Sequence, residues 1–298
     1  MRSKKSDFHL PIQDAFPVAV NHTGEIGIEV EVEGQNLPKG FPSYWNYVVD
    51  PSLRGESAEY VLKKPATRDT FKNYLKYLEK NLTADPVKIK NSPRTSVHVH
   101  INMNDRTMVQ VYNYICLYLV LEDLLIQHIS PERNGNLFCL KASDAEALID
   151  MLVKAANTRI WGPDENIFRY SSCNVCAIEK FNSLEFRAMR GTISADEISE
   201  WVNILLAIKD VAVEYKDPTE ISGEFSILGP EGFIRKVLPE YAGIIQNQIG
   251  WRERMWNNLR LVQEIIYSTD WGQQKKKEKR LFALGDDEEI VPDFNLEE

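Results

Sequence analysis

Residues 24–34 read GEIGIEVEVEG, an alternation of acidic and apolar residues that is typical of a β-strand. Side chains two positions apart along a strand point to the same face. Glu25, Glu29, Glu31 and Glu33 are therefore expected on one face, with isoleucine and valine side chains on the other. The apolar face is suited to a hydrophobic core, which leaves the acidic face for solvent or for a functional site.

Two further stretches show the same alternation. Residues 96–103 read SVHVHINM, which places His98 and His100 on one face, and residues 183–190 read SLEFRAMR, which does the same for Glu185 and Arg187. If the three strands belong to one sheet, carboxylates, imidazoles and a guanidinium gather on its polar face. This combination predicts a site for metal ions and phosphate.

The acidic and histidine residues also have a structural interpretation, because exposed acidic strand faces are common. Two observations favour a site. Neighbouring carboxylates such as Glu29 and Glu31 repel one another, and a divalent cation would relieve the repulsion. His98 and His100 are two of only five histidines in the chain. With glutamates as the other ligands, Mg²⁺ or Mn²⁺ fits better than zinc. Glu56 or Glu59 could add a further oxygen ligand.

Several arginines extend the polar pattern. Arg187 is followed by Arg190, while Arg169 and Asn174 come from the preceding strand region and Arg133 from a loop. Arginine is suited to phosphate and carboxylate groups because its planar fork donates two parallel hydrogen bonds. The pair formed by Glu185 and Arg187 could equally be structural, since opposite charges on one strand are ordinary.

Composition limits the class of protein. The chain has 298 residues, of which 43% are hydrophobic, and a net charge of −9, most of it in residues 285–298 with seven acids and no bases. The remainder is nearly neutral, which argues against nucleic-acid binding. Four cysteines are too few for a disulfide framework, and no secretory signal is visible at the N-terminus, so we expect a cytoplasmic protein. The apolar stretch Tyr114–Ile126 predicts a buried helix and no membrane span.

Strand and helix patterns alternate along the chain. Helical spacing is expected at 68–82, 106–129, 143–156, 195–215, 232–237 and 252–267. Strands are expected at 24–34, 44–50, 58–63 and 96–103, and residues 168–190 predict a hairpin that turns near 180–183. This order indicates an α+β fold with a largely antiparallel sheet. We expect an irregular lead-in over 1–23, one catalytic domain over 24–270 with a helical C-terminal part, and a charged tail over 271–298.

Taken in order, these motifs resemble the amidoligase family, carboxylate–amine ligases related to glutamine synthetase and glutamate–cysteine ligase. The resemblance spans about residues 24–192. The segments that carry it are GIEVE at 27–31, DPSL at 50–53 leading to EYV at 59–61, VHVH at 97–100, PER at 131–133 with NLFC at 136–139, RYSSCN at 169–174, and LEFR at 184–187 with GT at 191–192. Residues 193–298 add nothing to it.

The resemblance implies a glutamine-synthetase-like catalytic domain, in which a curved antiparallel sheet has a concave active-site face and helices pack behind it. It also implies ATP and two divalent ions, Mg²⁺ or Mn²⁺. By position, the metal ligands would be Glu29, Glu31, Glu59, His98 and Glu185. The residues facing ATP phosphates or the substrate carboxylate would be His100, Arg133, Arg169, Asn174, Arg187 and Arg190. Glu56 is the candidate base that accepts a proton from the amine, and Arg187 is the second candidate catalytic residue.

The sequence therefore predicts an ATP-dependent ligase that joins a small-molecule or peptide carboxylate to an amine through an acyl phosphate. A metal-dependent hydrolase with the same polar face is one alternative, and nucleotide dependence separates the two. A non-catalytic interaction protein with the same fold is another. The tail could also serve self-association or the docking of a partner. We expect no nucleic-acid or membrane partner.

Overall fold

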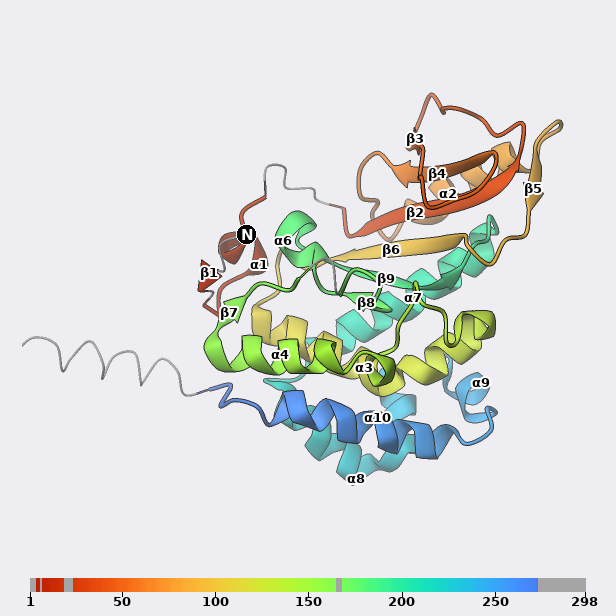
Figure 1. Ribbon diagram of the computed structural model, residues 1–298. Helices are drawn as coiled ribbons and strands as arrows, with labels where there is room; N and C mark the ends of the chain where they lie inside the picture. Colours follow the sequence, from red (N-terminus) through yellow and green to blue (C-terminus); the bar gives the residue numbers. More distant parts are fainter. Residues whose placement is uncertain (1–3, 6, 19–23, 165–167, 273–298) are drawn as a thin grey trace, which may run out of the picture.

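An antiparallel sheet forms one side of the protein (Figure 1). The computed structural model describes residues 4–5, 7–18, 24–164 and 168–272. The strand order is β3-β4-β2-β6-β9-β8, and β5 pairs with the end of β2. These strands are β2 (Ile26–Gln35), β3 (Trp45–Val48), β4 (Ser57–Leu62), β5 (Lys88–Lys90), β6 (Ser96–Asn102), β8 (Cys173–Asn174) and β9 (Ser183–Arg190).

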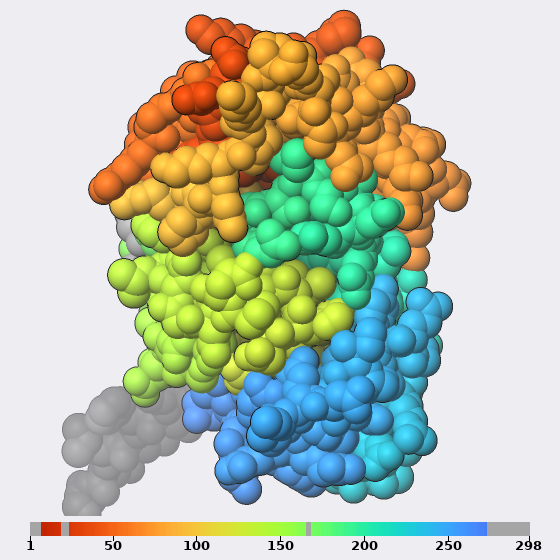
Figure 2. Space-filling view, turned by 90° about the vertical axis from the view of Figure 1, so that its right-hand side faces the viewer, coloured from red at the N-terminus to blue at the C-terminus, as the bar shows by residue number. Residues whose placement is uncertain are grey.

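Helices fill the other side of the molecule. In Figure 1, α3 and α7 lie beneath the sheet, and α8 and α10 lie beneath α3. The larger helices are α2 (Phe71–Leu82), α3 (Met108–Ile129), α4 (Glu146–Thr158), α7 (Ala195–Ala212), α8 (Pro218–Val237) and α10 (Trp251–Ile266). The shorter ones are α1 (Ile12–Ala15), α6 (Ala177–Phe181), α9 (Ala242–Gln246), and the 3₁₀ turns η1 (Pro131–Arg133) and η2 (Ala142–Asp144). Figure 2 shows the N-terminal strands and the C-terminal helices at opposite ends of the molecule.

The α+β fold class and the largely antiparallel, open sheet are as the sequence predicts. Each pairing of the sheet among the described residues is antiparallel. The curvature and the concave face that the family resemblance implies stay predictions.

The apolar residues of the alternating strands form the core side of the sheet. Ile28 and Val30 of β2 and Val99 of β6 are almost completely buried. On β9, Phe186 packs against Tyr114 and Tyr118 of α3, with ring centroids 5.4 and 4.9 Å apart. This face packs on the helical layer and leaves the polar face of the same strands free for a site.

The long helix α3 is the centre of the helical layer. It begins at a capping box, in which Thr107 accepts a hydrogen bond from the backbone N–H of Gln110 and the Gln110 side chain accepts one from Thr107. It is the one helix among the described residues that is long and apolar enough to cross a membrane. However, 89% of its most apolar window is buried inside the protein. Burial among other helices accounts for its composition, as the sequence predicts for Tyr114–Ile126.

Several parts of the fold differ from the sequence prediction. The helix predicted at 232–237 is the end of α8, which begins at Pro218, and β5 is not among the predicted strands. The N-terminal segment is not irregular throughout, because β1 (Lys4–Lys5) pairs with β7 (Ile160–Trp161) and α1 follows it. Phe8, Ile12 and Phe16 of this segment are buried in the core, so its apolar side chains outweigh the disruption expected from two prolines. Residues 168–190 are not a simple hairpin, since α6 lies between β8 and β9. Of the predicted tail at 271–298, residues 273–298 lie outside the described part of the chain.

Candidate functional site

Strand register brings the predicted acidic and histidine residues together on one face. Glu29 of β2 lies directly opposite His98 of β6, and Glu31 lies opposite Glu59 of β4. His100 lies opposite Glu185 of β9. Residues directly opposite each other on neighbouring strands have their side chains in contact range. Four adjacent strands therefore contribute to a single cluster.

A β-bulge adjusts the last of these strands. Val97 pairs with Met189 and Val99 with Phe186, so β9 has one residue more than β6 between these pairs. Arg187 and Ala188 are the two residues of β9 between these pairs, where β6 has only His98. A bulge changes the direction of a side chain relative to the regular ladder. Here the Arg187 guanidinium forms an ion pair with Glu185.

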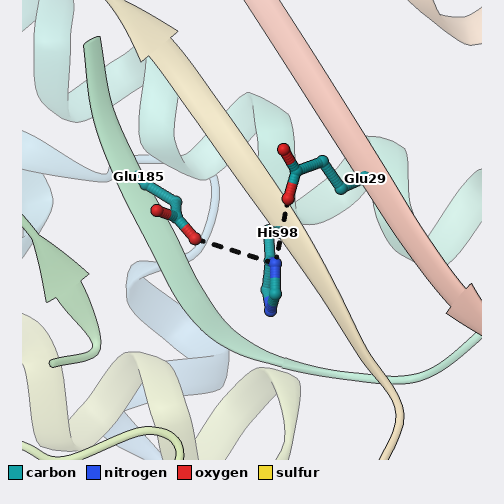
Figure 3. Close-up of side chains that lie close together, drawn as sticks. All are labelled: Glu29, His98 and Glu185. Carbon is teal, nitrogen blue, oxygen red and sulfur yellow. Dashed lines mark hydrogen bonds and ion pairs between the residues drawn. The ribbon is translucent and has the colours of Figure 1, made fainter. Parts of the chain in front are cut away.

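His98 is the centre of the cluster (Figure 3). Its Nδ1 lies 3.2 Å from Oε2 of Glu29 and 3.7 Å from Oε1 of Glu185. Its Nε2 lies 3.9 Å from Oε1 of Glu31. The residue is only 3% exposed. Each ring nitrogen thus faces a different group of carboxylates.

Two sets of side chains in this cluster could hold a metal ion. One consists of Glu29, His98 and Glu185, and the other of Glu31, Glu59 and His98. In each set the potential ligand atoms lie within 4.8 Å of one another. Two carboxylates and one imidazole per set match the preference of Mg²⁺ and Mn²⁺ for oxygen-rich sites. The donor set therefore fits the ions that the resemblance implies.

The electrostatics of the cluster show an excess of negative charge. Burial, together with the charges of Glu29, Glu31 and Asp50, raises the pKa of Glu59 to about 8. Burial also acts to raise the pKa of Glu29, but hydrogen bonds and positive charge from His100 and His98 outweigh it and hold that pKa well below its ordinary value. One carboxylate is thus kept ionised by the imidazoles while another is pushed towards its neutral form. A divalent cation would supply the missing positive charge.

Small polar residues hold the cluster in place. The backbone N–H and the hydroxyl of Ser96 both bind Oε2 of Glu31, at 2.8 and 2.7 Å, and the same hydroxyl lies 2.8 Å from Nε2 of His98. The side-chain amide of Asn174 donates a hydrogen bond of 2.6 Å to Glu185. Asn174 therefore orients Glu185 in this structure, whereas the sequence prediction places it against ATP or substrate.

Arginines line a cavity of about 200 Å³ beside the cluster. Arg187 and Arg169 are among its lining residues, as predicted, and Arg169 also lies over the ring of Tyr170 at 4.6 Å. Arg94 lines it too, although it is not among the predicted residues. It lies in a turn before β6, where strand alternation gives no signal that could have identified it. Three guanidinium groups next to a cluster of carboxylates suit a ligand that carries phosphate and metal together.

Three of the predicted residues belong neither to the carboxylate cluster nor to the lining of this cavity. Glu56 accepts a hydrogen bond from the backbone N–H of Leu37 at 2.9 Å and lines a different cavity. Glu56 immediately precedes β4. Because Glu56 and Glu59 are three positions apart, strand alternation directs their side chains to opposite faces. Glu56 therefore lies outside the cluster, to which Glu59 contributes its carboxylate, and the role of Glu56 as the base stays a prediction.

Arg190 and Arg133 are the other two. Arg190 forms ion pairs with Glu132 and Glu197, which hold its guanidinium away from the cluster. Arg133 is 2% exposed and donates a hydrogen bond of 3.2 Å from Nη2 to the carbonyl oxygen of Arg187. Burial lowers the pKa of Arg133. Its contact with Arg187 indicates a role in supporting that strand.

A family model matches the middle of the chain. Residues 69–209 match the family model described as "Putative amidoligase enzyme". The resemblance to the amidoligase family is confirmed. The matched segment contains His98, His100, Glu185 and Arg187, while the glutamates of β2 and β4 precede it. The family description indicates an amide-bond ligase in general. No curated protein shows significant similarity to the chain.

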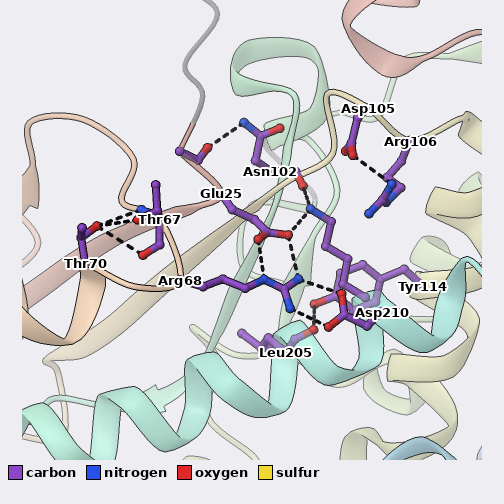
Figure 4. Close-up of polar contacts among 12 residues, drawn as sticks. Glu25, Thr67, Arg68, Thr70, Asn102, Asp105, Arg106, Tyr114, Leu205 and Asp210 are labelled. Carbon is purple, nitrogen blue, oxygen red and sulfur yellow. Dashed lines mark hydrogen bonds and ion pairs between the residues drawn. The ribbon is translucent and has the colours of Figure 1, made fainter.

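Glu25, the first glutamate of the alternating stretch, is part of an ion network at the edge of the site (Figure 4). Its carboxylate binds Lys209 of α7 at 2.6 Å and Arg68 at 2.7 and 3.0 Å, and Arg68 also binds Asp210. Burial acts to raise the pKa of Glu25, but the hydrogen bonds and charges of Arg68 and Lys209 outweigh it and lower that pKa to about 2. The network ties the start of β2 to α7.

Metal binding is the first test of the site. We expect Mn²⁺ to stabilise the protein against thermal unfolding, by about 2.7 kcal/mol at a hundredfold excess over the dissociation constant. Glu59→Gln and Glu185→Gln should each weaken Mn²⁺ binding in calorimetry by at least about tenfold, because each removes one anionic oxygen donor. Glu56→Gln is the matched control and should bind Mn²⁺ like the parent. Equal affinities in all four proteins would show that the cluster is not a metal site.

The ion network of Glu25 predicts a dependence of stability on pH. Glu25→Gln leaves the buried ammonium of Lys209 without a counter-charge, so we expect it to lower the free energy of unfolding by about 3 kcal/mol at neutral pH. The lowered pKa means that ionised Glu25 stabilises the fold above its ordinary pKa of 4.5, and that this contribution is lost as the pH falls towards 2. The difference between parent and variant in urea denaturation should therefore shrink in acid. A difference that stays constant with pH would exclude the charge as its cause.

Proposed function

We propose that the protein is an ATP-dependent ligase that joins a carboxylate to an amine, with Mg²⁺ or Mn²⁺ as cofactor. The observation that carries this proposal is the contact between the two acidic sets around His98 and the cavity lined by Arg94, Arg169 and Arg187. Metal ions and arginines together neutralise the several anions that such a reaction must assemble. The family match supports the formation of an amide bond.

The reaction follows from the weak reactivity of a carboxylate. A carboxylate oxygen attacks the γ-phosphorus of ATP, the bond to the bridging oxygen breaks, and ADP leaves with its electron pair. The amine nitrogen then attacks the carbonyl carbon of the acyl phosphate, loses a proton, and inorganic phosphate leaves. Bound metal ions would contribute charge neutralisation at the phosphate oxygens. No covalent enzyme intermediate is needed.

The charge of each side chain determines the role that we propose for it. Arg187 is placed to bind a phosphate oxygen, since its Nε is buried and has no hydrogen-bond partner among the described residues. Arg94 and Arg169 line the same cavity and would hold further phosphate oxygens. Glu29, Glu31, Glu59, His98 and Glu185 would hold the metal ions. Ser96 and Asn174 keep two of these carboxylates oriented.

Product analysis tests the reaction class. Incubation with ATP, Mg²⁺ and a mixture of amine and carboxylate metabolites should give ADP and a product whose mass equals the two substrates less one water. Glu29→Gln and Glu185→Gln should abolish the divalent-ion-dependent formation of ADP while circular dichroism stays unchanged. Products that have gained water, formed without ADP, would identify a metal-dependent hydrolase instead.

The planar fork of Arg187 gives a second test. Arg187→Lys keeps the positive charge but loses the paired donors, so we expect roughly a hundredfold loss of ATP turnover. Arg190→Lys is the matched control, because Arg190 is bound to Glu132 and Glu197 outside the cavity. If the two variants turn over ATP at the same rate as the parent, Arg187 has only a structural role.

A further inference from the structure

A second cavity, of about 340 Å³, lies on the other side of Glu29 from the arginine-lined one. Glu29 lines both cavities, and His100 lines the second, where their side chains are 3.4 Å apart. This volume falls within the range of small-molecule sites. The reacting groups of two ligands, one in each cavity, would meet at Glu29.

The second cavity owes its space to a glycine on the polar face of β2. Gly27 occupies the position between Glu25 and Glu29 and pairs with His100. A Cβ atom at Gly27 would lie 3.1 Å from the Cβ of His100, so a larger residue would crowd the histidine. Glycine inside a strand often marks a place where a ligand approaches closely.

The walls of the second cavity are mainly apolar. Val61 of β4 lies directly opposite Glu29, which places its side chain on the same face. Phe181 of α6 is 61% exposed and meets the His100 ring edge-on, with centroids 5.7 Å apart. Val18, Leu62 and Pro65 also contribute to the apolar lining. A ligand here would bury an apolar body and present one polar group to Glu29.

The distribution of charge separates the two cavities. Arg94, Arg169 and Arg187 line the first. Among the described residues, the cations that line the second are Lys63 and Lys180, and the Lys63 ammonium donates to the carbonyl oxygens of Phe41 and Pro42 at 3.3 and 3.5 Å. The carboxylate of Glu25 in the second cavity is already bound by Lys209 and Arg68 (Figure 4). The partners of Glu29 are the imidazoles of His98 and His100, so it is not already bound by a lysine or an arginine as Glu25 is, which favours a positively charged group over an anion.

From this arrangement we propose that the second cavity binds the amine substrate, a primary amine with a short apolar body. Its amino group lies beside Glu29 and its body lies against Val61 and Phe181. The proposal rests on the proposed ligase function and names the class of its amine. It separates the polyanionic ligand, in the arginine-lined cavity, from the amine on the opposite side of the carboxylate cluster.

Ligand binding by the intact protein tests this proposal. The probes are n-hexylamine and hexanoate, titrated by calorimetry in the presence of Mg²⁺ and a non-hydrolysable ATP analogue. We expect hexylamine to bind and hexanoate not to bind. Val61→Trp should weaken hexylamine binding by at least about tenfold, because the indole would occupy the space of the apolar body. Val213→Trp is the matched control on the exposed end of α7 and should bind like the parent.

The outcomes distinguish this proposal from the ligase function. If the parent binds neither Mg²⁺ nor the ATP analogue, the proposed function fails. If the parent binds both, the amine site is overturned by hexanoate binding that Val61→Trp weakens, or by hexylamine binding that Val61→Trp does not affect. Should Val61→Trp fail to fold, Phe181→Ala serves instead, because Phe181 is largely exposed. Its expected result is weaker hexylamine binding with unchanged binding of the ATP analogue, and unchanged hexylamine binding would overturn the proposal.

Discussion

Repulsion among the carboxylates around His98 is the constraint on which the site depends. Two unit charges 4 Å apart interact by about 4 kcal/mol at an effective dielectric constant of about 20. Several pairs among four carboxylates are close enough to repel one another in this way: Glu29, Glu31, Glu59 and Glu185. The imidazoles, Arg187 and the raised pKa of Glu59 offset part of this repulsion. Glu59 stays partly protonated because the cluster lacks positive charge, and a divalent cation would supply that charge.

The apolar face of the sheet makes this arrangement possible. Residues between the acidic ones, such as Val30 and Val99, are fully buried against the helices. A slip of one residue in strand register would move these side chains out of the core and the acidic ones into it. The free energy of core burial therefore fixes the register, and the register holds like charges together. Ser96 and Asn174 then orient individual carboxylates.

Alternation along the strands was enough to predict the face of the site. It placed Glu29, Glu31, His98 and Glu185 correctly because each belongs to a regular strand whose other face is buried. The same alternation separates Glu56 from Glu59, because residues three positions apart along a strand point to opposite faces.

The remaining differences between the predicted and the observed positions come from features without periodicity. Arg190 follows the bulge in β9, and its direction is set by Glu132 and Glu197, which are distant in sequence or belong to the next helix. Arg94 lies in the irregular segment before β6, where no strand period applies. The burial of Phe8 and Phe16 depends on tertiary contacts with elements far along the chain. The direction and burial of such side chains depend on tertiary contacts, which cannot be predicted from the local sequence.

Glu29 connects the two halves of the proposed chemistry. It contacts His98 on the side of the arginine-lined cavity and His100 on the side of the apolar one. The histidines alternate with Val99, so the same strand period that buries the valine directs both imidazoles to Glu29. A ligase must keep a polyanion and a nucleophile apart until both are bound, and then bring them within bonding distance. A single carboxylate shared between a cationic cavity and an apolar one would hold the two ligands on opposite sides and place their reacting groups next to the same side chain.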